Sequence, residues 1–373
     1  MRLDGIDDYP FHQVPTPFNV PATTDSKYND GYWFSCFSDD WYVALGLRLH
    51  PNVNTVDGFA SVTHRGTQRV LRASRALRPG YDDMVTGPIR VEIVEPMKRQ
   101  RLTVADNESG IALDLEFTAL APAYLEGRYQ HMKYGVVVND MTRYTQACRA
   151  SGTLTIPGET VRPEAWSAIR DHSWGVRTSM GAPIRFSGSE RTAGEADERA
   201  IRLWVPFDAG DHSGFFQTHE DPHGRTIDFE GRIDFPDGTS VDLTGVTHHL
   251  EYQPGTPRPI GGSWDLHGAD GVTRHYDLRS AGAPTEVHGF GYYSGWHDGR
   301  GPGNYRGLEV LEHDEYSCEP GDVPSGPEHV KPEKRMGPTE YPMHMVGPGG
   351  STGMAHLEHH IFGRYQPYGF SQE

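Results

Sequence analysis

Turn-forming residues interrupt the chain at short intervals, and this limits the possible folds more than any other feature of the sequence. The chain has 44 glycines and 28 prolines among its 373 residues. Segments with partial apolar and polar alternation, such as Val43 to His50, lie between turn signals about 8–12 residues apart. Long amphipathic helices are missing from the pattern, and the best helix candidate is a short one at 140–147. The sequence therefore predicts an all-β fold built from antiparallel barrels or sandwiches.

The strand-like segments occur in two groups, which predicts two β domains. The irregular, Pro-rich stretch 1–27 is expected to be an N-terminal arm. Residues 28–160 are expected to form the first domain, and residues 161–373 the second domain with a C-terminal extension. Aromatic and glycine residues recur with similar spacing in both halves. This favours a duplication, although two Gly-rich β segments can also match by coincidence.

The charge of the chain excludes some classes of partner. Lys and Arg number 34 and Asp and Glu number 51, a net charge of −17, so we expect no general binding of nucleic acid or of anionic membranes. No apolar run approaches the roughly 18 residues of a membrane span, so we expect no stable membrane insertion. Three distant cysteines and the lack of a signal-peptide pattern predict a cytoplasmic protein with reduced thiols.

One short segment, from Ile169 to Arg177, concentrates groups that can do chemistry. In an extended strand, Asp171 faces one side of a sheet, and His172 and Trp174 face the other. A carboxyl group that is buried in an aromatic-lined cavity has a raised pKa and can protonate a double bond. The π face of Trp174 can stabilise a developing cation, and His172 can activate water or assist Asp171.

A structural role for the same segment is physically as reasonable. Arg177 stacked on Trp174 can close one end of a β-barrel, and Asp171 then pairs with a neighbouring arginine. The aromatic residues Tyr32 and Trp33 pose the same question. Such side chains supply core packing first, and they can also line a cavity for a hydrophobic ligand.

The sequence RDHSWGVR at 170–177 resembles a motif of the AttH-like proteins, a family that includes the carotenoid 1,2-hydratases. The stretches 144–156 and 291–293 are also similar, and the resemblance spans roughly Tyr32 to the C-terminus. It implies two tandem lipocalin-like (calycin) β-barrels and gives Asp171 the role of proton donor. We expect the carotenoid enzymes to carry a tyrosine just before the aspartate. This chain has Arg170 there, a departure that counts against a carotenoid substrate but leaves the acid in place.

Two functions of different kinds fit these observations. The first is a cofactor-independent hydratase, dehydratase or isomerase, a hydro-lyase of the carotenoid 1,2-hydratase type. It would protonate a double bond in a hydrophobic small molecule of the isoprenoid or terpenoid kind. The second is a non-catalytic, lipocalin-like carrier of a hydrophobic ligand. A carbohydrate-active β-sandwich is a weaker third, because no paired-carboxylate motif supports it. The candidate catalytic residues are Asp171 and His172, and the candidate substrate-binding residues are Tyr32, Trp33, Trp174 and Arg177.

Twenty histidines raise the question of a bound metal. On a strand, His356, Glu358 and His360 would place three potential ligands on one face, and His248 and His249 are further candidates. None of these belongs to a recognised zinc or cupin-type signature. The sequence also lacks a Rossmann or haem-attachment signature. We therefore expect no metal site and no cofactor.

Overall fold

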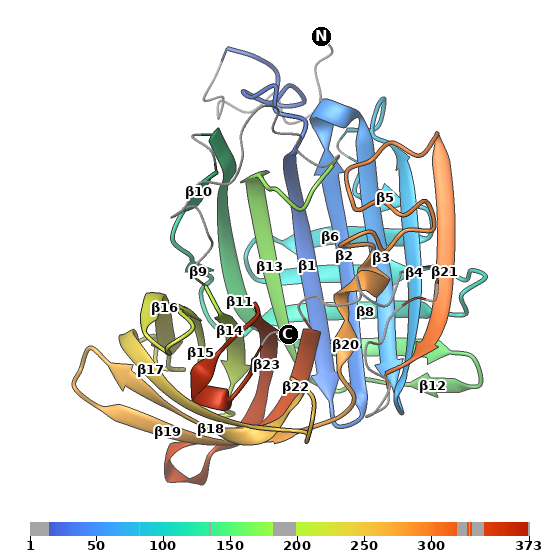
Figure 1. The fold of residues 1–373 in the computed structure, drawn as a ribbon. Coiled ribbons are helices and arrows are strands. Elements are labelled where there is room, and N and C mark those ends of the chain that lie inside the picture. The colour runs from blue at the N-terminus through green and yellow to red at the C-terminus, as the bar shows by residue number, and fades with distance from the viewer. Residues whose placement is uncertain are drawn as a thin grey trace.

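Antiparallel strands, arranged in two sheets, dominate the structure (Figure 1). The computed structural model describes residues 15–81, 83–133, 136–181, 199–318, 327, 329 and 339–371. Strands make up 60% of the structure, and the described residues contain no α-helix, so the all-β prediction is confirmed. Helical turns are limited to short 3-10 segments: η2 (Pro51–Val53), η3 (Val287–Phe290), η5 (Pro348–Gly350) and η6 (Gln366–Tyr368). No helix in the described part of the chain has the length and apolar character of a membrane crossing.

The first sheet is a large, curled half-barrel that wraps around an apolar core (Figure 1). Its strands are β1 (Tyr28–Ser38), β2 (Trp41–His50), β3 (Thr55–His64), β4 (Thr67–Ala76), β5 (Val85–Thr86), β6 (Ile89–Glu95), β7 (Arg99–Val104), β8 (Ala112–Ala119), β9 (Tyr124–Leu125), β10 (Tyr129–Lys133), β11 (Val136–Ile156), β12 (Glu159–Val161), β13 (Trp166–Val176) and β21 (Glu309–Ser317). The order is β21-β4-β3-β2-β1-β13-β11-β8-β7-β6-β5, and β9, β10 and β12 pair with β11. The helix predicted at 140–147 is wrong, because these residues lie inside β11.

The second sheet has nine strands, and eight of them, all except β20, close into a barrel. Its strands are β14 (Ile201–Asp208), β15 (Ser213–Glu220), β16 (Thr226–Asp234), β17 (Ser240–Tyr252), β18 (Pro259–Gly268), β19 (Thr273–Ser280), β20 (Thr285–Glu286), β22 (Thr339–Val346) and β23 (Thr352–Ile361). The order is β19-β18-β17-β16-β15-β14-β23-β22-β20, and pairing between β19 and β22 completes the ring. The prediction of two lipocalin-like domains is confirmed, with one closed barrel and one half-barrel.

Alternation of side chains along each strand explains how the two sheets meet. In β14, Ile201, Leu203 and Phe207 are fully buried in the core of the barrel. Trp204 points the other way and packs against Ile169 of β13, between the two sheets. Burial of one large apolar side chain contributes about 1.5–3 kcal/mol, so both faces of this strand stabilise the structure.

The two sheets do not divide the chain at residues 160 and 161, where the sequence placed the domain boundary. β13 follows that position, yet it is hydrogen-bonded between β1 and β11 of the first sheet. β21 also returns from the second half of the chain to pair with β4. These pairings join segments that are far apart in sequence, and local turn signals contain no information about them. Of the expected N-terminal arm, residues 1–14 lie outside the described residues.

Gly175 permits the close pairing of β13 with β11, which gives the first testable prediction. Its φ is +127°, and a Cβ atom there would lie 2.2 Å from the carbonyl oxygen of Asp140. Gly158 also has a positive φ, +82°, but its Cβ position is open. A positive φ costs an ordinary residue roughly 1–2 kcal/mol. We expect Gly175→Ala to lower the free energy of unfolding by clearly more than the matched control Gly158→Ala, as measured by urea denaturation. Equal losses would show that β11 and β13 tolerate the added methyl group.

Candidate functional site

Asp171 lies in a small cavity between the two sheets, with a volume of about 50 Å³. The pairing of β1 with β13 sets Trp33 opposite Asp171, so both side chains project from the same face of the first sheet. Strands β13 and β11 face β14 and β23 of the barrel there (Figure 1). The cavity is lined from the first sheet by Trp33, Arg48, Arg143, Asp171 and Arg177, from the barrel by Trp204, Glu340, His356 and Glu358, and from the intervening segment by Val287, Tyr292 and Tyr293.

The carboxyl group of Asp171 has a charged environment but no close partner. Its Oδ1 atom is buried and makes no hydrogen bond with any described residue. Arg48 donates instead to the Oδ1 of Asn29, at 2.6 Å, and to the Oγ of Ser173, at 2.9 Å. Arg143 donates to the carboxylate of Glu126 at 2.8 Å. Because both arginines are held by other acceptors, the Asp171 carboxyl remains available to a molecule in the cavity.

Burial raises the pKa of Asp171 above the ordinary value of an aspartate. Desolvation is the largest cause, since a charge is poorly stabilised away from water. The positive charges of Arg143, Arg48 and Arg177 oppose the shift, and the negative charge of Glu126 adds to it. The net direction favours the protonated form, which is the form that can donate a proton.

The other two acids of the cavity are already paired. His356 Nε2 lies 2.6 Å from the carboxylate of Glu340, and its Nδ1 lies 3.0 Å from the hydroxyl of Tyr42. The imidazole is thus hydrogen-bonded through Nδ1 and in ion-pair contact with Glu340 through Nε2. Glu358 forms an ion pair with Arg202. Among the acids lining this cavity, Asp171 is the one without a charged partner in contact.

His172, Trp174 and Tyr32 lie on the opposite face of the first sheet from Asp171. The rings of His172 and Tyr32 are 4.4 Å apart, and those of His172 and Trp174 are 5.2 Å apart. His172 Nε2 lies 2.6 Å from the Oδ1 of Asp30, and Tyr32 packs on the core of the half-barrel. The expected catalytic pair is therefore separated, because neighbouring residues of a strand point to opposite faces. Nor do Tyr32 and Trp174 join Trp33 in lining the cavity.

Arg177 and Trp33 are the two predicted substrate-binding residues found beside Asp171, and their role in binding stays a prediction. Both line the cavity. The guanidinium of Arg177 lies over the ring of Tyr292, 5.8 Å from its centre, rather than on Trp174 as the structural alternative requires. Trp33 makes an edge-on contact with Phe290, at 4.9 Å between ring centres. The segment 287–293 thus packs against both residues.

Backbone strain marks the cavity wall formed by Tyr292 and Tyr293. Tyr293 and Ser294 have φ values of +50° and +75°, a region that residues other than glycine rarely adopt. Such conformations cost about 1–3 kcal/mol each and occur often at functional sites. The stretch 291–293 is similar to the AttH-like proteins, but the sequence predicts no site residue there. Nor does it predict Arg143 or Trp204, since only tertiary packing brings them to Asp171.

The three residues of β23 that were considered as metal ligands, His356, Glu358 and His360, do not form one cluster. His356 and Glu358 both line the cavity, as their shared strand face predicts, but each has its own partner. His360 is not among the cavity-lining residues, and its ring lies 4.0 Å from that of Phe362.

Comparisons with known proteins place the chain in a family. The model of a family of unknown function, DUF8625, matches residues 3–371. The chain belongs to this family. No curated protein matches the sequence.

Several solved structures share features of the fold. An AttH-like protein from Nitrosomonas europaea aligns at 11% identity and a TM-score of 0.51, over 94% of this chain and 98% of that chain. Kievitone hydratase from Nectria haematococca aligns at 11% identity and a TM-score of 0.44, over 91% and 92% of the two chains. CghA, solved with Sch210972, gives 10% identity, a TM-score of 0.48 and coverage of 90% and 89%. The first of these confirms, at the level of the fold, the resemblance to AttH-like proteins that the sequence suggested.

The environment of Asp171 predicts a stabilising substitution. At about pH 7 the carboxyl of the unfolded chain is ionised, whereas burial raises the pKa of Asp171 in the folded protein and makes ionisation there costly. At about pH 4, near the unfolded value, the proton is largely retained in the folded state and the cost fades. We expect Asp171→Asn to raise the free energy of unfolding at pH 7, and the difference from the native protein to shrink toward pH 4. Chemical denaturation of both proteins at pH 7 and pH 4 measures this difference in the free energy of unfolding. A variant less stable at both would show that Asp171 stabilises the fold through its arginine neighbours.

Proposed function

We propose that this protein is a cofactor-independent hydratase, dehydratase or isomerase, with Asp171 as the proton donor to a double bond of a small molecule. One observation supports this above all others. The buried carboxyl of Asp171 has a raised pKa and an oxygen without a hydrogen-bond partner, and it lies in a cavity lined by aromatic rings. A purely structural aspartate at such a position is expected to form a direct pair with an arginine.

The proposed reaction begins with transfer of the Asp171 proton to one carbon of the double bond. The π electrons form the new C–H bond, and the other carbon becomes cationic. The ring of Trp33, which lines the same cavity, stabilises that cation by cation–π attraction. Addition of water and loss of its proton to the Asp171 carboxylate gives a hydrated product. Loss of a proton from a neighbouring carbon gives an isomer instead, and the reverse of hydration is a dehydration.

The cavity walls suggest a substrate with both apolar and oxygen-bearing parts. Trp33, Trp204 and Tyr292 offer aromatic surface, and Arg177 offers a cation at the edge of that surface. An oxygenated terpenoid or a related molecule has both kinds of group. A volume of about 50 Å³ is small for such a molecule, so its entry requires a wall to move. The strained wall at Tyr293 and Ser294 is the segment we propose for that movement.

A non-catalytic carrier is the alternative function. Carriers with this fold hold their ligand in an apolar barrel interior. Here large side chains fill the interior of the closed barrel, including Trp264, Phe216 and Tyr276. The cavity beside Asp171 is instead rich in charged groups. Both features favour the enzyme.

The proposed proton transfer can be tested with a ligand that copurifies with the protein and is identified by mass spectrometry. Incubation of that ligand or its product with the native protein in D₂O is expected to introduce deuterium at carbon, because Asp171 exchanges its proton with solvent. Loss of a general acid typically slows a reaction by about 10²–10⁴-fold. Asp171→Asn should therefore reduce deuterium incorporation by that factor, as measured by NMR or mass spectrometry.

The matched control is Asp114→Asn. Asp114 is an exposed aspartate of β8 that pairs with Arg101 of β7. This substitution should leave deuterium incorporation unchanged. Quenching of tryptophan fluorescence, which reports on Trp33 and Trp204, should show that Asp171→Asn still binds the ligand. Normal turnover by a folded Asp171→Asn variant would prove the assignment wrong. Binding without any deuterium incorporation by the native protein would favour the carrier.

A further inference from the structure

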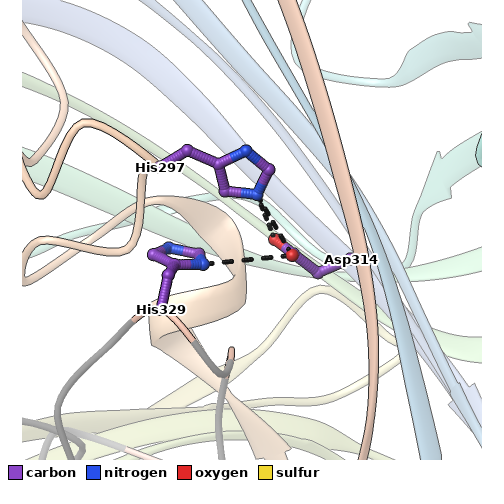
Figure 2. A group of neighbouring side chains, drawn as sticks. All are labelled: His297, Asp314 and His329. Atoms are coloured by element: carbon purple, nitrogen blue, oxygen red, sulfur yellow. Dashed lines mark hydrogen bonds and ion pairs between the residues drawn. The ribbon is translucent and has the colours of Figure 1, made fainter.

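A second group of chemically active side chains lies outside the Asp171 cavity, on the outer side of the first sheet. Figure 2 shows His297, Asp314 and His329 with their side chains directed at one another. Their ligand atoms all lie within 4.8 Å of one another. Asp314 belongs to β21, whereas His297 follows the segment that carries Tyr292 and Tyr293. The three residues have no regular spacing in sequence, so no motif search detects them.

We propose that His297, Asp314 and His329 bind a divalent transition-metal ion of the zinc kind. Two imidazoles and one carboxylate suit zinc, cobalt, nickel or iron(II), whereas magnesium and calcium prefer oxygen ligands alone. This proposal goes beyond the function proposed for Asp171 and does not depend on it. It also departs from the expectation of no metal site, which rested on the absence of a sequence signature.

The hydrogen bond made by His329 determines which of its nitrogens faces the site. Its Nε2 lies 3.0 Å from the carbonyl oxygen of Gly295. A carbonyl can only accept, so Nε2 carries the hydrogen and Nδ1 of the neutral ring carries a lone pair. That Nδ1 lies 3.9 Å from the Oδ1 of Asp314. A lone pair and a carboxylate oxygen repel each other, and a cation between them would reverse the sign of the interaction.

His297 has a similar arrangement of inner and outer partners. Its Nε2 is 3.1 Å from the Oδ1 of Asp314, and its Nδ1 is 3.8 Å from the Oε2 of Glu312. When Nε2 binds a metal ion, the hydrogen moves to Nδ1 and faces the Glu312 carboxylate. Metal-binding histidines usually donate their second nitrogen to a carboxylate or a carbonyl. His329 has such an outer partner at hydrogen-bond distance, and for His297 the Glu312 carboxylate lies 3.8 Å away.

The spacing of the ligand atoms suits an ion with only small adjustments. Zinc–ligand bonds of about 2.0–2.2 Å in a tetrahedron place ligand atoms roughly 3.3 Å apart. The nitrogens of His297 and His329 lie 3.1 and 3.9 Å from the same carboxylate oxygen. The ligand atoms are at most 4.8 Å apart, and both His297 and His329 are exposed, so their rings can turn to shorten the longer separations.

Among the described residues, buried Arg72 is the cation that contacts Asp314 and could oppose a metal ion. Its Nη2 pairs with the Oδ2 of Asp314 and lies 3.4 Å from the Oε2 of Glu312. Oδ1 of Asp314 is therefore the atom left for the metal ion. Two carboxylates against one guanidinium leave a net negative charge beside the site, which favours a cation.

A bound ion would attach the wall of the Asp171 cavity to the first sheet. His297 lies four residues after Tyr293, and Gly295 between them accepts the hydrogen bond of His329. Asp314 is fixed to β4 through Arg72. Metal binding would thus stabilise the strained segment at Tyr293 and Ser294.

The test uses the purified full chain after treatment with a chelator. Titration with CoCl₂ should produce the visible absorption of a nitrogen-liganded cobalt ion and saturate at one equivalent. ZnCl₂ should displace the cobalt and raise the melting temperature. His297→Ala and His329→Ala should each weaken cobalt binding by at least about 10-fold. The matched control His313→Ala removes the exposed neighbour of Asp314 on β21 and should bind like the native protein.

Three outcomes would overturn the proposal. The first is native protein that shows no saturable cobalt binding. The second is binding that survives both His297→Ala and His329→Ala, which would place the ion on other histidines. The third is a loss of cobalt affinity in His313→Ala as large as the loss in His297→Ala and His329→Ala. Since the readouts are metal binding and thermal stability, failure here leaves the proposed role of Asp171 untouched, and failure of that role leaves this site untouched.

Discussion

The pairing of β13 with a strand on each side is the constraint on which the rest of this structure depends. Hydrogen bonds to β1 and β11 fix the register of β13 along its whole length. A slip of one residue would turn every side chain to the other face of the sheet. The register therefore decides that Asp171 faces the barrel and that His172 faces the core of the half-barrel. The absence of a side chain at Gly175 lets β11 approach closely enough to hold this arrangement.

The contact between the two sheets brings together charges that neither sheet could bury alone. Arg143 pairs with Glu126, and Trp204 of the barrel donates its indole hydrogen to the same carboxylate at 3.2 Å. The guanidinium of Arg143 also lies over the Trp204 ring. A buried charge is tolerated when it is paired and hydrogen-bonded. Asp171 lies beside this network, but its Oδ1 atom has no hydrogen-bond partner. A buried polar atom without a partner is more common at functional sites than elsewhere.

The segment between β20 and β21 connects the two proposed sites. It supplies Tyr292 and Tyr293 to the wall of the cavity and His297 to the group around Asp314. Its Trp296 is fully buried, and the guanidinium of Arg306 lies 4.0 Å from the centre of the Trp296 ring. One irregular segment, held by aromatic packing, thus contributes side chains on both sides of a short turn.

The sequence by itself determined the class of fold and singled out Asp171, the residue proposed as the acid. Turn density and alternation predicted an all-β chain, and the motif at 170–177 identified Asp171 and Arg177, both of which reach the cavity. The same alternation already placed His172 and Trp174 on the other face. The sequence did not indicate which distant segments pack against these residues. The place of β13 in the first sheet, the approach of Trp204 and Arg143 to Asp171, and the meeting of His297, Asp314 and His329 all depend on contacts between distant segments. Tertiary structure alone decided these, because periodicity reports which way a side chain points but not what it meets there.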